Sequence, residues 1–229
     1  MYKLIILILF LSSASIADEK RLSIAVDTPQ YVQRSEHKSL NYNSRVRFLV
    51  IHYTSSNWQR SLELLTLPEY QVSAHYLIPE SFDETYHEQD LAVYQLVDEN
   101  ERAWHAGKSQ WEDRENINDQ SIGIELVNNS ACYYQDDNES LDFTDDYMCS
   151  FRDYDPKQIQ LLIALSKQIL SRHLEITPTR VIGHADVQSG VKSDPGPKFP
   201  WFTLHQHGIG AWYDHETVNK YWLKFTEET

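Results

Sequence analysis

Two histidines and one aspartate, at separated points of the chain, have the chemistry to hold one metal ion. His52 ends the apolar run FLVIHY, and His184 and Asp194 lie in VIGHADVQSGVKSDPGPKFPW, residues 181–201. Two imidazole nitrogens and one carboxylate oxygen form a common catalytic zinc shell, which leaves the fourth position to water. The chain has ten histidines, so residue type and spacing alone support this set only weakly. Our hypothesis is a zinc site at His52, His184 and Asp194.

A glutamate and a lysine could supply the remaining chemistry of a hydrolase. Glu125 interrupts the apolar run SIGIELV at 121–127, where burying a carboxylate costs free energy unless it is paired or used. Partial desolvation raises the pKa of a glutamate and suits it to general-base catalysis. Strand alternation offers a plainer interpretation, in which Glu125 faces the solvent. Lys192 could stabilise an oxyanion as a fixed cation, or it could be an ordinary surface charge beside Asp194.

The elements expected around these residues alternate between strands and helices. Apolar runs predict strands at 46–53, 74–78, 91–97, 121–127 and 179–183. Leucines at helical spacing predict a helix over 60–67, and short helices are expected at 201–206 and 216–225. Asp155 followed by Pro156 predicts the start of the strongest helix, as N-cap and first helical residue. This alternation indicates a single α/β domain.

The start of the chain has the pattern of a secretory signal peptide. Lys3 precedes an apolar run at 4–11, and Ser15-Ile16-Ala17 gives a small-x-small cleavage site. The run is far shorter than the roughly 18–20 apolar residues that span a bilayer. We therefore expect residues 1–17 to be removed and residues 18–229 to form the mature domain. That domain is expected in the periplasm or secreted, soluble and without a stable membrane anchor.

Charge and cysteine usage narrow the possible partners and the compartment. The chain has 20 Lys and Arg against 34 Asp and Glu, a net charge of −14, which argues against nucleic-acid binding. Its two cysteines, Cys132 and Cys149, lie in an acidic, tyrosine-rich segment at 128–154. In an oxidising compartment they could form a disulfide. Zinc thiolates are the alternative, but neither cysteine has a CxxC partner or a flanking histidine.

Six short segments in order carry a resemblance to one enzyme family: IHYT at 51–54, SAHYLI at 73–78, AWHAG at 103–107, SIGIELVN at 121–128, GHAD at 183–186 and KSDPGP at 192–197. Together they resemble the zinc-dependent N-acetylmuramoyl-L-alanine amidases of the AmpD/AmiD type. The resemblance extends from about residue 46 to GIGAWYD at 208–214. It implies the fold shared with peptidoglycan recognition proteins, a central mixed sheet flanked by helices.

The resemblance also implies a role for each candidate site residue. The family's zinc ligands, catalytic glutamate and catalytic lysine fall, in that order, on His52, His184, Asp194, Glu125 and Lys192. The AWHAG segment lines the substrate groove in the family, which makes His105 a candidate substrate contact. The implied substrate is peptidoglycan or its muropeptides. The bond cleaved would be the amide between the lactyl group of N-acetylmuramic acid and L-alanine.

Two other functions are compatible with parts of this pattern. A peptidoglycan recognition protein that binds muropeptides without cleaving them typically lacks one metal ligand, whereas this chain has candidates for all three. A zinc peptidase acting within the stem peptide is the other alternative, and no HExxH segment favours it. Compared with the family, we expect no lipid anchor and no C-terminal wall-binding domain. The segment 128–154 is longer than expected, so the resemblance does not determine the rim of the groove or the substrate preference.

Overall fold

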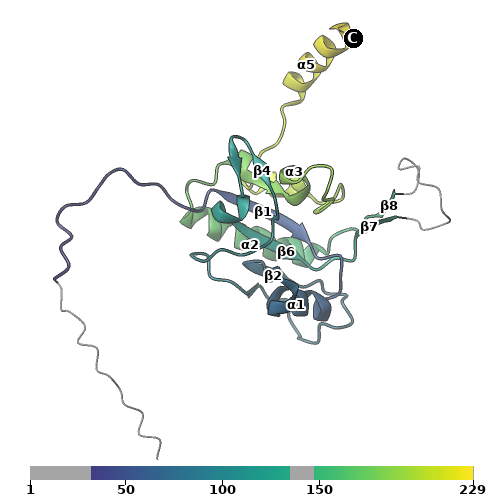
Figure 1. Cartoon of the computed structure of the whole chain (residues 1–229). Coiled ribbons are helices and arrows are strands. Elements are labelled where there is room, and N and C mark those ends of the chain that lie inside the picture. The colour runs from purple at the N-terminus through teal and green to yellow at the C-terminus, as the bar shows by residue number, and fades with distance from the viewer. Residues whose placement is uncertain (1–31, 135–146, 229) are drawn as a thin grey trace, which may run out of the picture. The chain divides into compact units, whose positions relative to one another are not determined.

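Five strands form one mixed sheet, in the spatial order β3 (Tyr94–Gln95), β2 (Tyr76–Ile78), β6 (Ser121–Leu126), β1 (Phe48–Tyr53) and β9 (Val181–Gly183) (Figure 1). β2, β6, β1 and β9 pair in parallel, whereas β3 pairs antiparallel with β2. This computed structural model describes residues 32–134 and 147–228, so the predicted signal peptide at 1–17 lies outside it. Residues 32–42 belong to a separate unit and contain no helix or strand.

The remaining elements are helices and two small hairpins. The helices are α1 (Trp58–Thr66), α2 (Pro156–Arg172), α3 (His184–Val187), α4 (Trp201–Gln206) and α5 (His215–Glu228), with 3-10 turns η1 (Pro68–Tyr70), η2 (Ile117–Gln120) and η3 (Pro178–Arg180). The hairpins are β4 (Gln110–Trp111) with β5 (Arg114–Glu115), and β7 (Ala131–Tyr134) with β8 (Tyr147–Ser150). The predicted α/β fold with a mixed sheet flanked by helices is confirmed.

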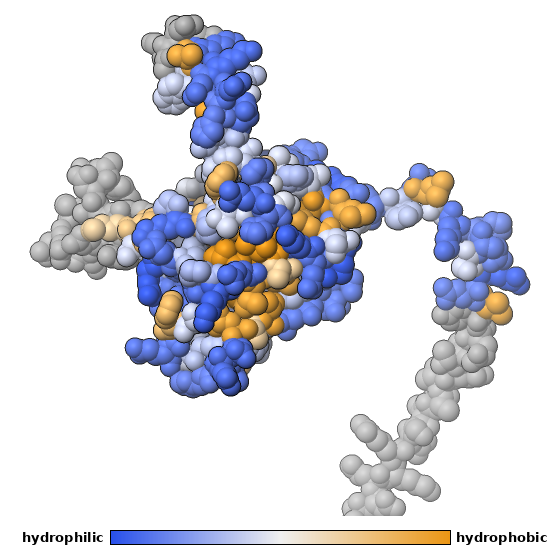
Figure 2. All heavy atoms as spheres, turned by 180° about the vertical axis from the view of Figure 1, so that it is seen from behind, coloured by the Kyte–Doolittle hydropathy of each residue, from blue (hydrophilic) through white to orange (hydrophobic). Residues whose placement is uncertain are grey.

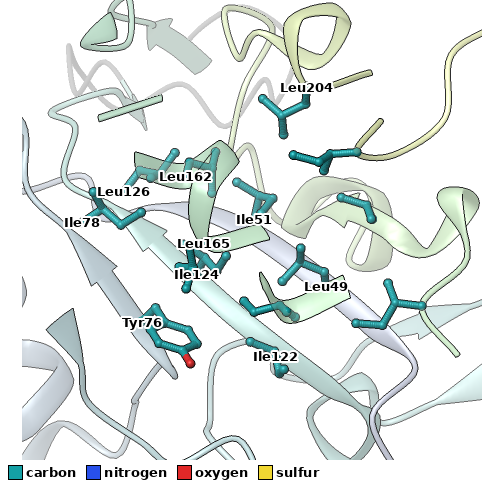
Figure 3. Packing of buried hydrophobic residues seen from close by; sticks show 14 of the residues in the cluster. Leu49, Ile51, Tyr76, Ile78, Ile122, Ile124, Leu126, Leu162, Leu165 and Leu204 are labelled. Carbon is teal, nitrogen blue, oxygen red and sulfur yellow. The ribbon is translucent and has the colours of Figure 1, made fainter. Parts of the chain in front are cut away.

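Helix α2 begins as the sequence predicts and covers one face of the sheet. The Asp155 side chain accepts a hydrogen bond from the Lys157 amide, and Pro156 occupies the first turn, where a missing N–H costs nothing. The apolar stripe of α2 packs on alternate residues of β1 and β6 (Figure 3); the cluster includes Leu49, Ile51, Ile122, Ile124, Leu126, Leu162 and Leu165. Full burial of one such side chain contributes about 1.5–3 kcal/mol.

The opposite face of the sheet combines an apolar cluster with polar residues at the strand ends. Val50 and His52 of β1 lie in register with Gly123 and Glu125 of β6, so these four residues point to the same side. Val50 and Phe48 pack in a second apolar cluster, whereas His52 and Glu125 lie beyond it toward the carboxyl ends of their strands. In open parallel sheets, ligands bind at those ends.

The structure corrects some predicted elements. The strand expected at 91–97 is reduced to Tyr94–Gln95, because the amides of Leu96 and Val97 both turn to the carbonyl of His75. Neither hairpin nor α3 was predicted, since none has an apolar period of useful length.

On the face seen in Figure 2, hydrophilic residues predominate and hydrophobic residues are exposed mainly near the centre. No helix of the described ranges 32–134 and 147–228 is long and apolar enough to cross a membrane.

Candidate active site

His52, His184 and Asp194 reach one point from three parts of the chain. His52 lies near the end of β1, and His184 directly follows β9, the strand that pairs in parallel with β1. Asp194 lies in the loop after α3. Each offers one ligand atom within 4.8 Å of the others, and all three residues are buried. The structure therefore brings together the trio that the sequence pointed to.

The pKa shifts of Asp194 and His52 suit metal binding. Asp194 Oδ2 lies 2.9 Å from His52 Nδ1 and 3.1 Å from His184 Nδ1. Burial raises the pKa of Asp194, but hydrogen bonds from His184 and His52 outweigh burial and hold it below its usual range. Burial lowers the pKa of His52, and Asp194 offsets this only in part. An ionised carboxylate beside a neutral imidazole is the form in which these groups bind a metal.

A close backbone contact fixes the loop that carries Asp194. The Ala185 amide donates to the Asp194 carbonyl at 2.8 Å. A Cβ on Gly183 would lie 2.5 Å from Pro195 Cδ, so the loop can approach β9 this closely only because residue 183 is glycine. Tyr154 adds a hydrogen bond of 2.7 Å from its hydroxyl to the Pro195 carbonyl. Two hydrogen bonds therefore hold the backbone that carries the Asp194 side chain.

Glu125 is not the solvent-facing strand residue of the plainer interpretation. It is only partly exposed, and its Oε2 is buried without a hydrogen-bond partner among the described residues. Burial raises its pKa to about 8, and the charge of Asp194 adds to this while that of Lys192 opposes it. A carboxyl group with a pKa near neutrality, next in register to His52, has the properties of a general acid and base.

A groove of about 360 Å³ opens over these groups. Its lining includes Glu125, His184, Asp194 and Lys192, so the cation and the carboxyl groups face one space. Lys192 itself is exposed. Trp104, half exposed, also lines the groove and offers an apolar surface beside the polar groups. Such a mixture can orient a substrate over the reacting groups.

His105 lines the groove but is buried, and protein atoms engage both of its ring nitrogens. Nδ1 lies 3.0 Å from His52 Nε2, and Nε2 lies 3.1 Å from Ser121 Oγ. Burial holds the pKa of His105 well below its ordinary value, so its ring is neutral. Its contact with substrate stays a prediction. Sequence reasoning missed Ser121, although the residue stands on the Gly123 and Glu125 face of the same alternating run.

Cys132 and Cys149 form a disulfide between β7 and β8. They are directly paired residues of this antiparallel hairpin, and Cys132 also lines the groove. The hairpin begins shortly after β6, the strand that carries Glu125. Residues 135–146 of the predicted insert lie outside the described residues. The described part of the insert therefore contributes Cys132 to the lining of the groove.

Comparison with known proteins places this geometry in a family. The model of the N-acetylmuramoyl-L-alanine amidase family, Amidase_2, matches residues 42–197. The chain belongs to this amidase family. The match includes all three members of the candidate metal trio, Glu125 and Lys192.

Two amidases are similar to this chain in sequence. The amidase AmiD of Escherichia coli K12 is 43% identical over 177 residues, which cover 77% of this chain and 58% of AmiD. The 1,6-anhydro-N-acetylmuramyl-L-alanine amidase AmpD of the same organism is 34% identical over 131 residues, covering 57% of this chain and 55% of AmpD. The chain thus spans just over half the length of these relatives.

Two solved structures share the fold of this chain. AmpDh3 from Pseudomonas aeruginosa superimposes with a TM-score of 0.75 at 41% identity, over 88% of this chain and 74% of that one. The complex of E. coli AmiD with anhydro-N-acetylmuramic acid-L-Ala-D-gamma-Glu-L-Lys gives a TM-score of 0.67 at 40% identity, over 81% of this chain and 66% of that one.

Proposed function

We propose that this chain is a zinc-dependent N-acetylmuramoyl-L-alanine amidase. It hydrolyses the amide between the lactyl group of N-acetylmuramic acid and L-alanine, in peptidoglycan or in muropeptides. The observation that carries the proposal is the buried trio His52, His184 and Asp194, with Glu125 Oε2 buried and without a hydrogen-bond partner among the described residues. The names of AmiD and AmpD support the reaction, and the AmiD complex supports the class of substrate.

His52, His184 and Asp194 are the proposed zinc ligands. Two imidazoles and a carboxylate match a catalytic zinc site, and Asp194 Oδ2 lies 2.9 Å from His52 Nδ1 and 3.1 Å from His184 Nδ1. A zinc ion bound there supplies a Lewis acid for the scissile carbonyl and a water of lowered pKa. The two histidines lie at strand ends, and Asp194 lies in a loop that packs closely against Gly183. This rigid support keeps the ligands in place during turnover.

Glu125 is the proposed general base and then the general acid. It takes one proton from the attacking water as the carbon–oxygen bond forms, and returns it to the nitrogen of L-alanine as the carbon–nitrogen bond breaks. A carboxyl with a pKa of about 8 suits both steps near neutral pH. Lys192, which faces the same groove, stabilises the negative charge on the carbonyl oxygen. The products are a muramyl carboxylate and a stem peptide with a free amino terminus.

The proposal includes the maturation of the chain. Residues 1–17 act as a cleaved signal peptide, and residues 18–229 form the amidase domain, with its catalytic core at about 46–214 and its site of action in the periplasm or outside the cell. The signal-like sequence of the first residues supports export. The Cys132–Cys149 disulfide fits an oxidising compartment.

Mass spectrometry of purified muropeptides after incubation with the zinc-loaded protein tests the reaction. We expect release of intact stem peptide that begins with L-alanine, together with the peptide-free sugar. Cuts inside the stem peptide would instead identify a peptidase. Binding of muropeptides without any cleavage would support the recognition-protein alternative, which no contact in the described site favours.

A further inference from the structure

The two nitrogens of His52 face two different neighbours. Nδ1 lies 2.9 Å from Asp194 Oδ2, on the side of the candidate metal ligands. Nε2 lies on the other side of the ring, 3.0 Å from His105 Nδ1. His105 Nε2 in turn lies 3.1 Å from Ser121 Oγ. The three residues His52, His105 and Ser121 thus form a linear hydrogen-bonded chain, and each is at most 7% exposed.

The His105 ring is held in place from several directions. A Cβ on Gly123 would lie 2.5 Å from His105 Cγ, so the ring packs directly on the β6 backbone. The side-chain oxygen of Asn118 accepts hydrogen bonds from the amides of His105 and Ala106, at 3.0 and 2.8 Å. These contacts leave the ring little freedom to turn away from His52. Because the His105 ring is fixed in this way, it can orient the ring of His52.

The chain is compatible with two arrangements of its protons. A neutral imidazole offers one donor and one acceptor, whereas a hydroxyl can donate or accept. If His52 carries its proton on Nδ1, it donates to Asp194; His105 then donates to His52, and Ser121 donates to His105. If His52 carries its proton on Nε2, His105 accepts it on Nδ1 and donates from Nε2 to Ser121. Both arrangements contain the same number of protons, but in the second one His52 Nδ1 turns a lone pair toward Asp194 Oδ2 and cannot donate to it.

Metal binding through His52 Nδ1 would select the second arrangement. A histidine that coordinates through Nδ1 must present a lone pair there, so its proton must sit on Nε2. Without an acceptor at Nε2, that buried N–H would have no partner, which opposes metal binding. We propose that His105, supported by Ser121, is a positioning residue that fixes His52 in its metal-binding tautomer. This inference rests on the zinc site of the proposed function.

Two substitutions of His105 separate hydrogen bonding from packing. His105→Asn keeps an oxygen near the place of Nδ1, whereas His105→Leu has similar bulk and no acceptor. Zinc affinity is measured on metal-free proteins by competition with a chromophoric chelator. We expect His105→Leu to weaken zinc binding by about 10–100-fold, the usual effect of losing the hydrogen-bond partner of a metal-bound histidine. His105→Asn should recover most of this loss, and Ser121→Ala should have a smaller effect.

A second experiment determines the tautomers of His52 and His105 directly. Nitrogen-15 NMR of the zinc-loaded wild-type protein should show His52 protonated on Nε2, and His105 protonated on Nε2 but not on Nδ1. This measurement requires no variant, so it tests the proposal even if His105→Leu does not fold. Thermal unfolding of each metal-free variant checks that any change in zinc affinity comes from a folded protein.

The possible outcomes distinguish this inference from the proposed function. Failure of the folded wild-type protein to bind zinc would overturn both. Normal zinc binding by the wild type with unchanged affinity in His105→Leu would overturn only the positioning role. Equal loss in the Leu and Asn variants would show that ring packing, not the acceptor, matters. A His105 ring protonated on Nδ1 in the zinc-loaded protein would also contradict the proposal.

Discussion

His52 and Glu125 stand opposite each other in the parallel register of β1 and β6, on the same face of the sheet. A candidate metal ligand and the candidate base are therefore positioned by one set of strand hydrogen bonds. The apolar cluster around Phe48 and Val50 fills the same face nearer the strand starts, which leaves the polar pair at the carboxyl ends. Rigid strands, rather than loops, thus set the spacing between the ligand and the base.

The first prediction separates the base from a metal ligand. Glu125→Gln keeps the shape of the side chain but cannot accept the proton of water, so turnover should fall by about 10²–10⁴-fold. Zinc content should stay unchanged, whereas Asp194→Ala should lose zinc and activity together. Zinc analysis and initial rates are measured on the same folded samples, with the exposed Glu69→Gln as matched control. Near wild-type turnover in Glu125→Gln would remove Glu125 from the mechanism.

The second prediction concerns the cation of the groove. Lys192→Met should reduce kcat by about 10²–10³-fold, as expected when one stabilising contact to an oxyanion is lost. Its effect on KM should be small, because the charge it stabilises exists mainly in the transition state. Lys198→Met in the same loop is the control, since Lys198 pairs with Asp153 at 3.1 Å and is not among the groove residues. Equal effects of the two substitutions would contradict a specific role for Lys192.

Much of the fold followed from the sequence because its elements have strong local signals. The N-cap Asp155 with Pro156, and the apolar runs of β1 and β6, need no distant partner to be recognised. The His105 contact with His52 joins residues 53 positions apart and depends on Gly123, which allows the ring to approach β6. Residue type alone could suggest His105 as a groove residue but could not show what its nitrogens face. Likewise, strand alternation could not show whether Glu125 faces the solvent or a buried cleft. Only the packing of the folded chain shows that its Oε2 is buried.

The third prediction concerns acid stability through His75. Its Nδ1 accepts a hydrogen bond from the Gly123 amide, and burial lowers its pKa from 6.5 to about 4. The folded protein keeps His75 neutral while the unfolded chain takes up a proton below pH 6.5. The free energy of unfolding should therefore fall as the pH drops from 6.5 to 4, by on the order of 3 kcal/mol. Urea unfolding across this range should show a reduced slope in His75→Asn and an unchanged slope in the exposed His87→Asn.

The fourth prediction concerns Glu99, which joins two separate parts of the fold. Its carboxylate accepts hydrogen bonds from Arg172 at 2.6 Å and Tyr76 at 2.6 Å, and lies 2.7 Å from His173 Nε2. Burial raises its pKa, but these partners outweigh burial and lower it to about 2. The stabilisation is present above pH 4.5 and is lost as the pH falls through 2.

Glu99→Gln should therefore destabilise the protein at pH 7 by about 2 kcal/mol, the range of a charge-assisted hydrogen bond. The difference from the wild type should shrink between pH 4.5 and 2. Urea unfolding at several pH values measures both effects. Glu101→Gln is the neighbouring control, because Glu101 is held through its backbone: its carbonyl contacts His75 and Arg45, and its amide donates to Asp98. A difference that stays constant with pH would rule out the ionised carboxylate as its cause.

The last prediction concerns the Cys132–Cys149 disulfide beside the groove. Cys132 lines the groove, whereas the proposed metal ligands and catalytic residues lie on β1, on β6 and after β9, none of which belongs to the Cys132–Cys149 hairpin. The double substitution to serine should therefore raise KM for muropeptides while kcat stays within about threefold of the wild type, because the rim and not the reacting groups is loosened. It should also lower the free energy of unfolding by about 3 kcal/mol, the loop-entropy contribution for a bridge of this span. Steady-state kinetics and urea unfolding measure the two effects, and a reductant added to the wild-type protein should reproduce both. A large fall in kcat at unchanged KM would instead place the hairpin in the support of the catalytic groups.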